Sequence, residues 1–339
     1  MPDHQRPMEK KFPRDWAGSL DLYGGTGGIT AMCSCEEFLE VYKEDVTFRV
    51  RTPESIDPGR TNPNALFVAA VSDSVGSASP TVARVLLQGR DILEAAIFQE
   101  KIDEPSVVQA LHACKEALVV CEKVATRVAS QVDTIIGEIK ASDLKRDSRG
   151  LALNPFPQVS ELEADATTFL SHAKRSIRAI CRLPSIFLSV EAKDNNFDAL
   201  GRTLTAAIGA KAPVTEFVQA HAPGVRYLIE LRNYQEHPDA KRTVIENFAV
   251  MPNGTISVPM WYVSGETPRP IGEEMPAAVA FLVQMAEAIL IHLVMHAVDK
   301  RFPFIIQELD AGQVDPKMPI KYRLSVDVSK LKTSARASN

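Results

Sequence analysis

The chain is 339 residues long, 45% of them hydrophobic and 24% charged, with a formal net charge of -5 at pH 7. This composition is typical of a soluble globular protein with a sizeable core. The acidic balance argues against a protein that coats nucleic acid with its whole surface. Five cysteines at scattered positions favour a reducing cytoplasm over a disulfide framework, and the N-terminus lacks the pattern of a secretory signal.

Residues 1–78 are predicted to be loops with short elements. The glycine-rich stretch 24–28 lacks the Gly-Lys-Ser/Thr ending of a phosphate-binding loop and the spacing of a dinucleotide motif, so it is interpreted as a flexible turn. Residues 44–51 alternate well enough for a strand. The following stretch, 52–64, contains three prolines and is expected to be a loop.

A long antiparallel helical hairpin is predicted over residues 79–142. Pro80 suits a first helical turn, and 81–100 has apolar residues at helical spacing. A longer helix begins near Ser106, with an apolar stripe whose steps alternate four and three residues, as in a coiled-coil seam. The stripe comprises Val107, Leu111, Cys114, Leu118, Cys121, Ala125, Val128, Val132, Ile135 and Ile139. A helix of roughly 50 Å favours an arm that contacts a dimer partner or another protein.

The stretch 143–158 is polar and then proline-containing, which predicts a linker. A helical bundle is predicted over 159–301, with a β-hairpin at 243–263 around an Asn-Gly turn. Its expected helices begin at Ser160 and then cover 196–210, 214–221, 225–237 (after a break at Pro223-Gly224) and 275–300. The last helix is apolar enough to raise the question of a membrane span, and a central core helix is preferred because it contains glutamine, glutamate and two histidines. An extended segment over 302–328 and a disordered tail over 329–339 complete the chain.

Two groups of residues could in principle bind a metal. Cys33 and Cys35 do not form a CxxC pair and have no second pair to complete a zinc site. His292 and His296 lie one helical turn apart, but spacing suggests no third ligand, so core histidines are the preferred interpretation. The sequence therefore predicts neither a metal nor a cofactor.

A basic helix face is predicted in the bundle. Lys174, Arg178 and Arg182 recur every four residues, and Arg175 lies alongside. Residues 171–242 hold eleven Lys and Arg against seven Asp and Glu, a local excess of four positive charges in an acidic chain. Such a face is either a solvated surface or a track for a phosphate backbone.

The hexapeptide RNYQEH ends one predicted helix and runs directly into Pro238. Arg232 is always charged and can hold a non-bridging phosphate oxygen with two donors. His237, which the following proline pushes out of the helical region, can move a proton near neutral pH. Asn233 and Glu236 could orient either partner. The alternative is a helix end with a surface Arg-Glu pair and a terminal histidine.

This motif resembles the signature of the HEPN domain family, in which an arginine and a polar residue precede a histidine after a short gap. The resemblance covers about residues 160–300. It implies a helical bundle that dimerises with the two motifs facing each other. It further implies a metal-independent endoribonuclease, in which the RNA 2′-hydroxyl attacks the adjacent phosphate, in a toxin-antitoxin or antiviral-defence system. Arg232 and His237 would be catalytic, with Asn233 as a supporting member of the catalytic group.

The predicted fold class is mainly α: a helical bundle with a long antiparallel helical hairpin and a small β-hairpin insertion. The predicted function is that of a cytoplasmic, homodimeric, HEPN-like ribonuclease with RNA as its partner and no membrane association. Its candidates for binding RNA phosphate are Lys174, Arg175, Arg178 and Arg182. The alternative is a non-catalytic interaction or oligomerisation module, in which the long helix binds a protein and the motif is structural or binds a nucleotide.

Overall fold

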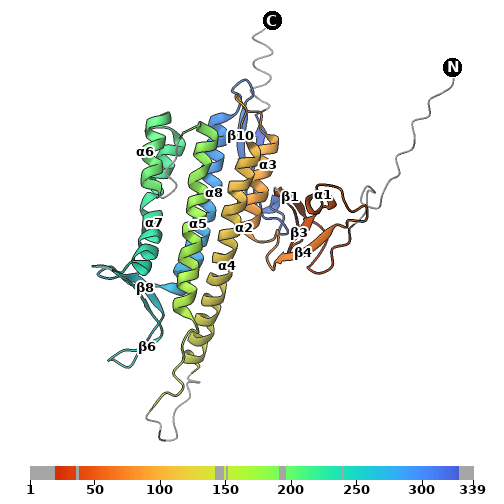
Figure 1. The fold of residues 1–339 in the computed structure, drawn as a ribbon. Helices are drawn as coiled ribbons and strands as arrows, with labels where there is room; N and C mark the ends of the chain where they lie inside the picture. Colours follow the sequence, from red (N-terminus) through yellow and green to blue (C-terminus); the bar gives the residue numbers. More distant parts are fainter. Residues whose placement is uncertain are drawn as a thin grey trace, which may run out of the picture. The chain divides into compact units, whose positions relative to one another are not determined.

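A computed structural model describes residues 20–35, 38–141, 149, 152–190, 196–238 and 240–327 (Figure 1). The chain divides into two compact units. The first contains residues 1–83 and 310–320, and the second contains 84–309 and 321–339. The predicted tail, 329–339, and part of the predicted linker lie outside the described residues.

The prediction of a mainly α fold is wrong. The structure is 52% helix and 17% strand, and its described residues form four small sheets, so the fold is mixed α and β. The largest of these sheets lies in the N-terminal segment, which was expected to be mostly loop. Its strands have five or six residues each. Apolar runs this short have little periodicity of their own, and they become strands because they pair with each other.

The first unit is built on an antiparallel sheet in the order β1-β2-β3-β4. Its strands are β1 (Ala31–Cys35), β2 (Phe38–Tyr42), β3 (Thr47–Arg51) and β4 (Val68–Asp73). One face of the sheet buries a small core of Val41, Val46, Phe48 and Val50. The short helix α1 (Pro53–Ile56) lies within the stretch that was expected to be a loop, and Thr52 caps it by accepting a hydrogen bond from the Ser55 backbone N–H.

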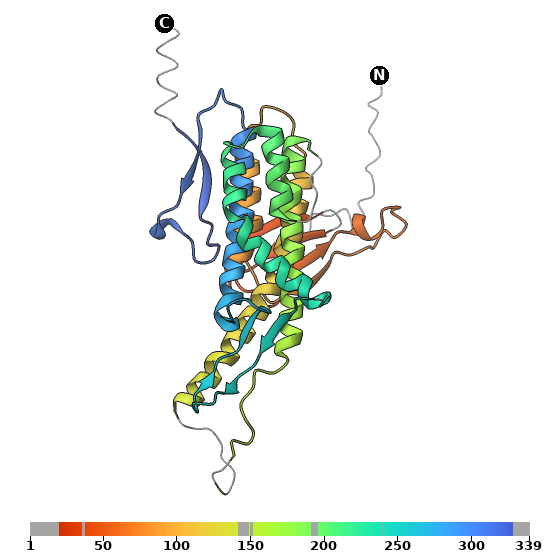
Figure 2. The ribbon, with the colours of Figure 1, turned by 90° about the vertical axis from the view of Figure 1, so that its left-hand side faces the viewer.

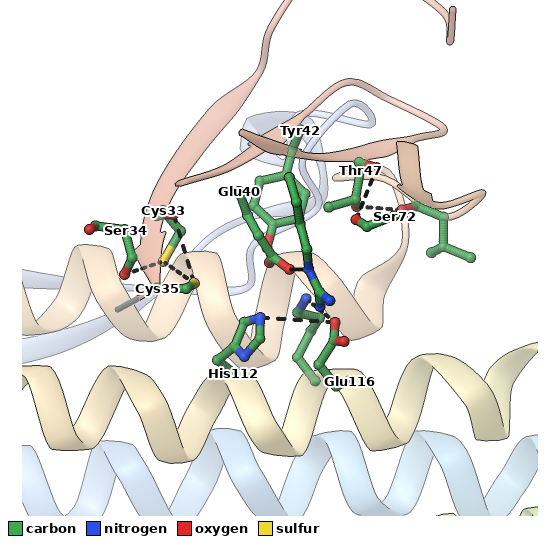
Figure 3. Close-up of polar contacts among 12 residues, drawn as sticks. Cys33, Ser34, Cys35, Glu40, Tyr42, Thr47, Ser72, His112 and Glu116 are labelled. Atoms are coloured by element: carbon green, nitrogen blue, oxygen red, sulfur yellow. Dashed lines mark hydrogen bonds and ion pairs between the residues drawn. The ribbon is translucent and has the colours of Figure 1, made fainter. Parts of the chain in front are cut away.

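The other face of the hairpin β1-β2 carries polar and sulfur-containing side chains (Figure 3). Glu40 is fully buried and accepts hydrogen bonds from the Tyr42 hydroxyl and, at 3.2 Å, from Arg49 Nε. Burial, followed by the charge of Glu40, raises the pKa of Tyr42, which therefore stays protonated. Cys33 and Cys35 are two residues apart on one strand and so share a face, with their Sγ atoms 4.0 Å apart.

The glycine-rich stretch 24–28 is a turn whose position is held by side chains. The backbone N–H and the hydroxyl of Thr26 each donate to the Asp45 carboxylate at 2.6 Å, and these bonds hold the pKa of Asp45 below its usual value. Gly25 and Gly27 have φ near +71° and +72°, a region that favours glycine. No phosphate-binding geometry is needed to explain the glycines.

The second unit is a bundle of long helices with small strands at its ends (Figures 1 and 2). Its helices are α3 (Gln88–Ala95), α4 (Glu104–Lys140), α5 (Leu162–Leu188), α6 (Phe197–Ile208), α7 (Pro213–Glu236) and α8 (Ile271–Ala297). Helix α4 packs chiefly against α5 and α8, and α5 also packs against α7. The strands around the Asn-Gly turn are present: β5 (Thr243–Glu246) pairs with β8 (Met260–Val263), and β6 (Ala249–Val250) pairs with β7 (Ile256–Ser257).

The predicted helical hairpin has a shorter first arm in the structure, and Gly89 of this arm packs against Leu111 of α4. Its first arm is divided into α2 (Pro80–Val82), a π-helical turn over Ala83–Leu87, and α3, which ends at Ala95. The apolar stripe of α4 is present as predicted and is buried up to Ile135. It packs on α5 and α8 of the same chain, because these later helices offer longer apolar faces than α3 does.

Helix α7 is continuous where a break was expected. It passes through Pro223 and Gly224, and one helix replaces the two that were predicted. A Cβ on Gly224 would lie 3.0 Å from the ring of Phe281, so the glycine allows this ring of α8 to approach α7 closely. Tertiary packing therefore outweighs the helix-breaking tendency of the Pro-Gly pair.

Helix α8 is long and apolar enough to cross a membrane by length and composition, and 56% of its most apolar window is buried inside the protein. It carries a buried carboxylate, Glu287, whose side chain accepts hydrogen bonds from Arg84 and Gln88. Gln88 Oε1 in turn accepts from the backbone N–H groups of Lys321 and Tyr322, at 2.6 and 2.7 Å. This network anchors the hairpin of β10 (Phe304–Glu308) and β11 (Tyr322–Val326) to α3.

The two histidines of α8 differ in environment. His296 is exposed, whereas His292 is partly buried, with its ring 5.5 Å from that of Phe217. Burial lowers the pKa of His292 from 6.5, so the folded protein resists protonating it.

We therefore expect the free energy of unfolding to fall as the pH drops below about 6.5. In that range His292 binds a proton in the unfolded chain but stays neutral in the folded chain. Urea unfolding of wild type and His292→Gln at pH 7.5 and 5.5 measures this, and the variant should lose less stability on acidification. His296→Gln, at an exposed position of the same helix, is the control. Equal pH dependence in wild type and His292→Gln would contradict the assignment.

Candidate functional site

The RNYQEH motif lies at the C-terminal end of α7. His237 is the C-cap, with φ -130° and ψ 67°, and its backbone N–H donates to the carbonyl oxygen of Asn233 at 2.8 Å. Two side-chain hydrogen bonds hold this end in place. Gln235 Nε2 donates to Thr167 Oγ1 of α5 at 2.7 Å, and Thr243 Oγ1 of β5 donates to the Leu231 carbonyl at 2.6 Å. The motif is thus fixed against α5.

A polar cavity of about 660 Å³ lies between the middle of α5 and the C-terminal part of α7. Its lining comprises Ser171, Lys174, Arg175, Arg178, Asn196, Ile229, Arg232, Asn233 and Glu236. Three of the four predicted phosphate-binding cations of α5 therefore share one cavity with the motif arginine. Among the residues that the structure describes, the lining contains four cationic side chains and one carboxylate, that of Glu236. A single carboxylate among four cations suits an anionic ligand and disfavours a metal cation.

A hydrogen bond between Lys174 and Asn233 connects the two helices at this cavity. Asn233 Oδ1 accepts from Lys174 Nζ at 3.1 Å and from Arg232 Nη1 at 3.3 Å. Burial, and then the charge of Arg232, lowers the pKa of Lys174, while Glu236 acts in the opposite direction. The cations therefore repel one another, and a bound anion would relieve that repulsion.

Glu236 connects the motif arginine to the motif histidine. Its Oε2 forms an ion pair with Arg232 one turn earlier in α7, and the same oxygen lies 3.9 Å from His237 Nε2. His237 does not line the cavity, and its side chain is 80% exposed. The imidazole and the guanidinium are thus separated by one carboxylate oxygen, with the imidazole on the solvent side.

Arg182 does not line the cavity, unlike the other three predicted cations of α5. It lies one helical turn beyond Arg178, in an exposed position. Sequence reasoning missed Ser171 and Asn196. Ser171 precedes Lys174 and Arg175 by three and four residues, so helical spacing could have indicated it. Asn196 reaches the site as the N-cap of α6, a tertiary placement for which the sequence held no signal.

Comparison with protein-family models, with curated proteins and with solved structures finds no match to this chain. The resemblance of the motif to the HEPN family therefore stays a prediction. What the site's geometry offers by itself is a cationic cavity with an ionisable imidazole beside it.

Proposed function

We propose that this protein is a metal-independent endoribonuclease of the HEPN type that holds an RNA phosphate in the cavity between α5 and α7. One observation carries the proposal: the motif arginine and three of the predicted phosphate-binding cations line a single cavity. Cations that are distant in sequence and gather at one solvent-reachable place can bind a phosphodiester. The negative charge of a phosphodiester repels hydroxide, so this charge must be neutralised before attack on phosphorus.

In the proposed reaction, Arg232 donates to a non-bridging oxygen of the scissile phosphate. A neutral His237 takes the proton of the 2′-hydroxyl, whose oxygen then bonds to phosphorus. The bond from phosphorus to the 5′ oxygen breaks, and this oxygen leaves with a proton from an imidazolium. The products are a 2′,3′-cyclic phosphate and a 5′-hydroxyl. In a homodimer with facing motifs, the second copy of His237 would supply the proton.

Glu236 has a defined part in this proposal. In the free protein its carboxylate neutralises Arg232, so an RNA phosphate must displace it to gain the guanidinium. The displaced carboxylate stays within reach of His237, where it can hold the imidazole through a hydrogen bond. A cytoplasmic location and a role in toxin-antitoxin or antiviral defence belong to the same proposal, through the family resemblance.

The alternative is a non-catalytic interaction module, and two observations favour it. His237 lies outside the cavity lining and Arg232 is paired within its own helix, as at an ordinary helix end. In the first unit, the edge strand β4 exposes Val68 and Val71 at 51% and 58%. An edge strand with exposed apolar residues can pair with a strand of another chain. Specific binding of RNA or protein without any RNA cleavage would decide for this alternative.

Arg232→Ala tests the nuclease proposal. Purified protein with single-stranded RNA and EDTA should yield 2′,3′-cyclic phosphate ends, and the variant should cleave about 10²- to 10³-fold more slowly because the phosphate loses its main charge partner. Arg182→Ala is the matched control, since it removes an equal charge from outside the cavity. An equal loss of cleavage rate in Arg232→Ala and Arg182→Ala, or absence of cleavage by the wild type, would refute a catalytic site at Arg232.

A further inference from the structure

The charge of the cavity exceeds what a single phosphodiester can neutralise. Within the described part of the chain, its lining has four cations, Lys174, Arg175, Arg178 and Arg232, against the carboxylate of Glu236, which leaves three net positive charges. An internucleotide phosphate carries one negative charge, and the next along the strand lies a nucleotide away. A cavity of about 660 Å³ is also the size of a small-molecule site and much larger than one phosphate group.

The lining recognises phosphate and offers little to a base. Among the described residues, no aromatic side chain lines the cavity, and Ile229 is its apolar member. Proteins that follow a single strand usually stack its bases on aromatic rings, and such a platform is missing from this lining. The bound group should therefore be densely charged and should need no stacking.

The side-chain oxygens of both asparagines in the lining are engaged within the protein. Asn196 Oδ1 accepts from the backbone N–H of Ala199, and Asn233 Oδ1 accepts from Lys174 and Arg232. With these oxygens engaged, the amide NH₂ groups are the parts left for a ligand. Asn196 also places the N-terminal end of the 12-residue helix α6 at the cavity, and the helix dipole adds partial positive charge there.

From this charge balance and donor set we infer that the cavity binds a triphosphate group, that is, condensed phosphates carrying about three to four negative charges within a few ångströms. Two sources share this chemistry: a free ribonucleoside triphosphate and the 5′ end of a newly made RNA. The inference rests on the anion-binding part of the proposed function and is independent of whether the site cleaves RNA.

Calorimetric titration at constant ionic strength tests whether the cavity binds a triphosphate group. The probes are inorganic tripolyphosphate and orthophosphate. Tripolyphosphate should bind at least about tenfold more tightly, because it can engage several cations at once. Arg178→Ala should weaken tripolyphosphate binding by about tenfold, and Arg182→Ala by less than about twofold. Glu236→Gln should strengthen it, since the competing carboxylate is gone. Circular dichroism verifies that each variant is folded.

Equal affinity for the two probes, or equal effects of Arg178→Ala and Arg182→Ala, would overturn the inference. The source of the triphosphate group is identified by comparing ATP with one RNA sequence that bears either a 5′-triphosphate or a 5′-hydroxyl. Tighter binding of the triphosphate RNA than of ATP identifies the RNA end as the ligand. Equal binding of the two identifies the free nucleotide. The two proposals fail separately. Cleavage of RNA without preference for tripolyphosphate removes this inference alone, and tripolyphosphate binding without cleavage removes the nuclease alone.

Discussion

His237→Ala is expected to slow RNA cleavage by about 10²- to 10⁴-fold while leaving the protein folded. Cleavage by the proposed route needs a group that takes a proton from the 2′-hydroxyl, and His237 is the imidazole that Glu236 Oε2 connects to Arg232. Its side chain is 80% exposed, so its removal leaves no cavity. The backbone N–H that caps α7 by donating to Asn233 remains in alanine.

The measurement is the initial rate of cleavage of a labelled RNA in the presence of EDTA. His296→Ala is the matched control, because it removes an exposed histidine from a helix end outside the site. Added imidazole should partly restore cleavage by His237→Ala, since the missing group is a proton carrier, and should leave Arg232→Ala unchanged. Undiminished cleavage by His237→Ala would end the assignment of this residue as the catalytic base.

Glu287→Ala is expected to lower the free energy of unfolding of the second unit by about 3 to 5 kcal/mol. The Glu287 side chain is 2% exposed and accepts from Arg84 and Gln88. Without it, the guanidinium faces a buried site with no counter-charge. Gln88 also loses the partner that orients its oxygen toward the backbone of β11, so the C-terminal hairpin should loosen as well.

Urea unfolding followed by tryptophan fluorescence measures this effect. The chain has two tryptophans, and in a Trp16→Phe background the signal comes from Trp261, which is buried against Phe169 in the second unit. The signal then reports this unit even if the two units unfold separately. Glu273→Ala, at an exposed position in the first turn of α8, is the control and should cost less than about 1 kcal/mol. Similar losses of unfolding free energy in Glu287→Ala and Glu273→Ala would show that the buried network contributes little to stability.

The long periodic helices were predictable because their signal is local and repeated. The stripe of α4 continues over nine buried positions, so chance alternation is a poor explanation for it. Strand β3 lies within the strand predicted over 44–51, but the other three strands of the first unit were not predictable in the same way. Each is five or six residues long, and strands of that length become stable by pairing with segments that can lie far away along the chain. The mixed fold class follows from these short strands.

The sequence by itself determined that Lys174, Arg175 and Arg178 share one side of a helix and that His237 ends another, because helical periodicity and the restriction before Pro238 act within a few residues. The tertiary structure decided which of these groups meet. Packing of α7 on α5 brought three of the four cations to one cavity with Arg232 and left Arg182 outside its lining, and the start of α6 added Asn196. The physical reason is that a cavity is formed by contacts between helices, whose partners depend on the burial of apolar faces throughout the second unit.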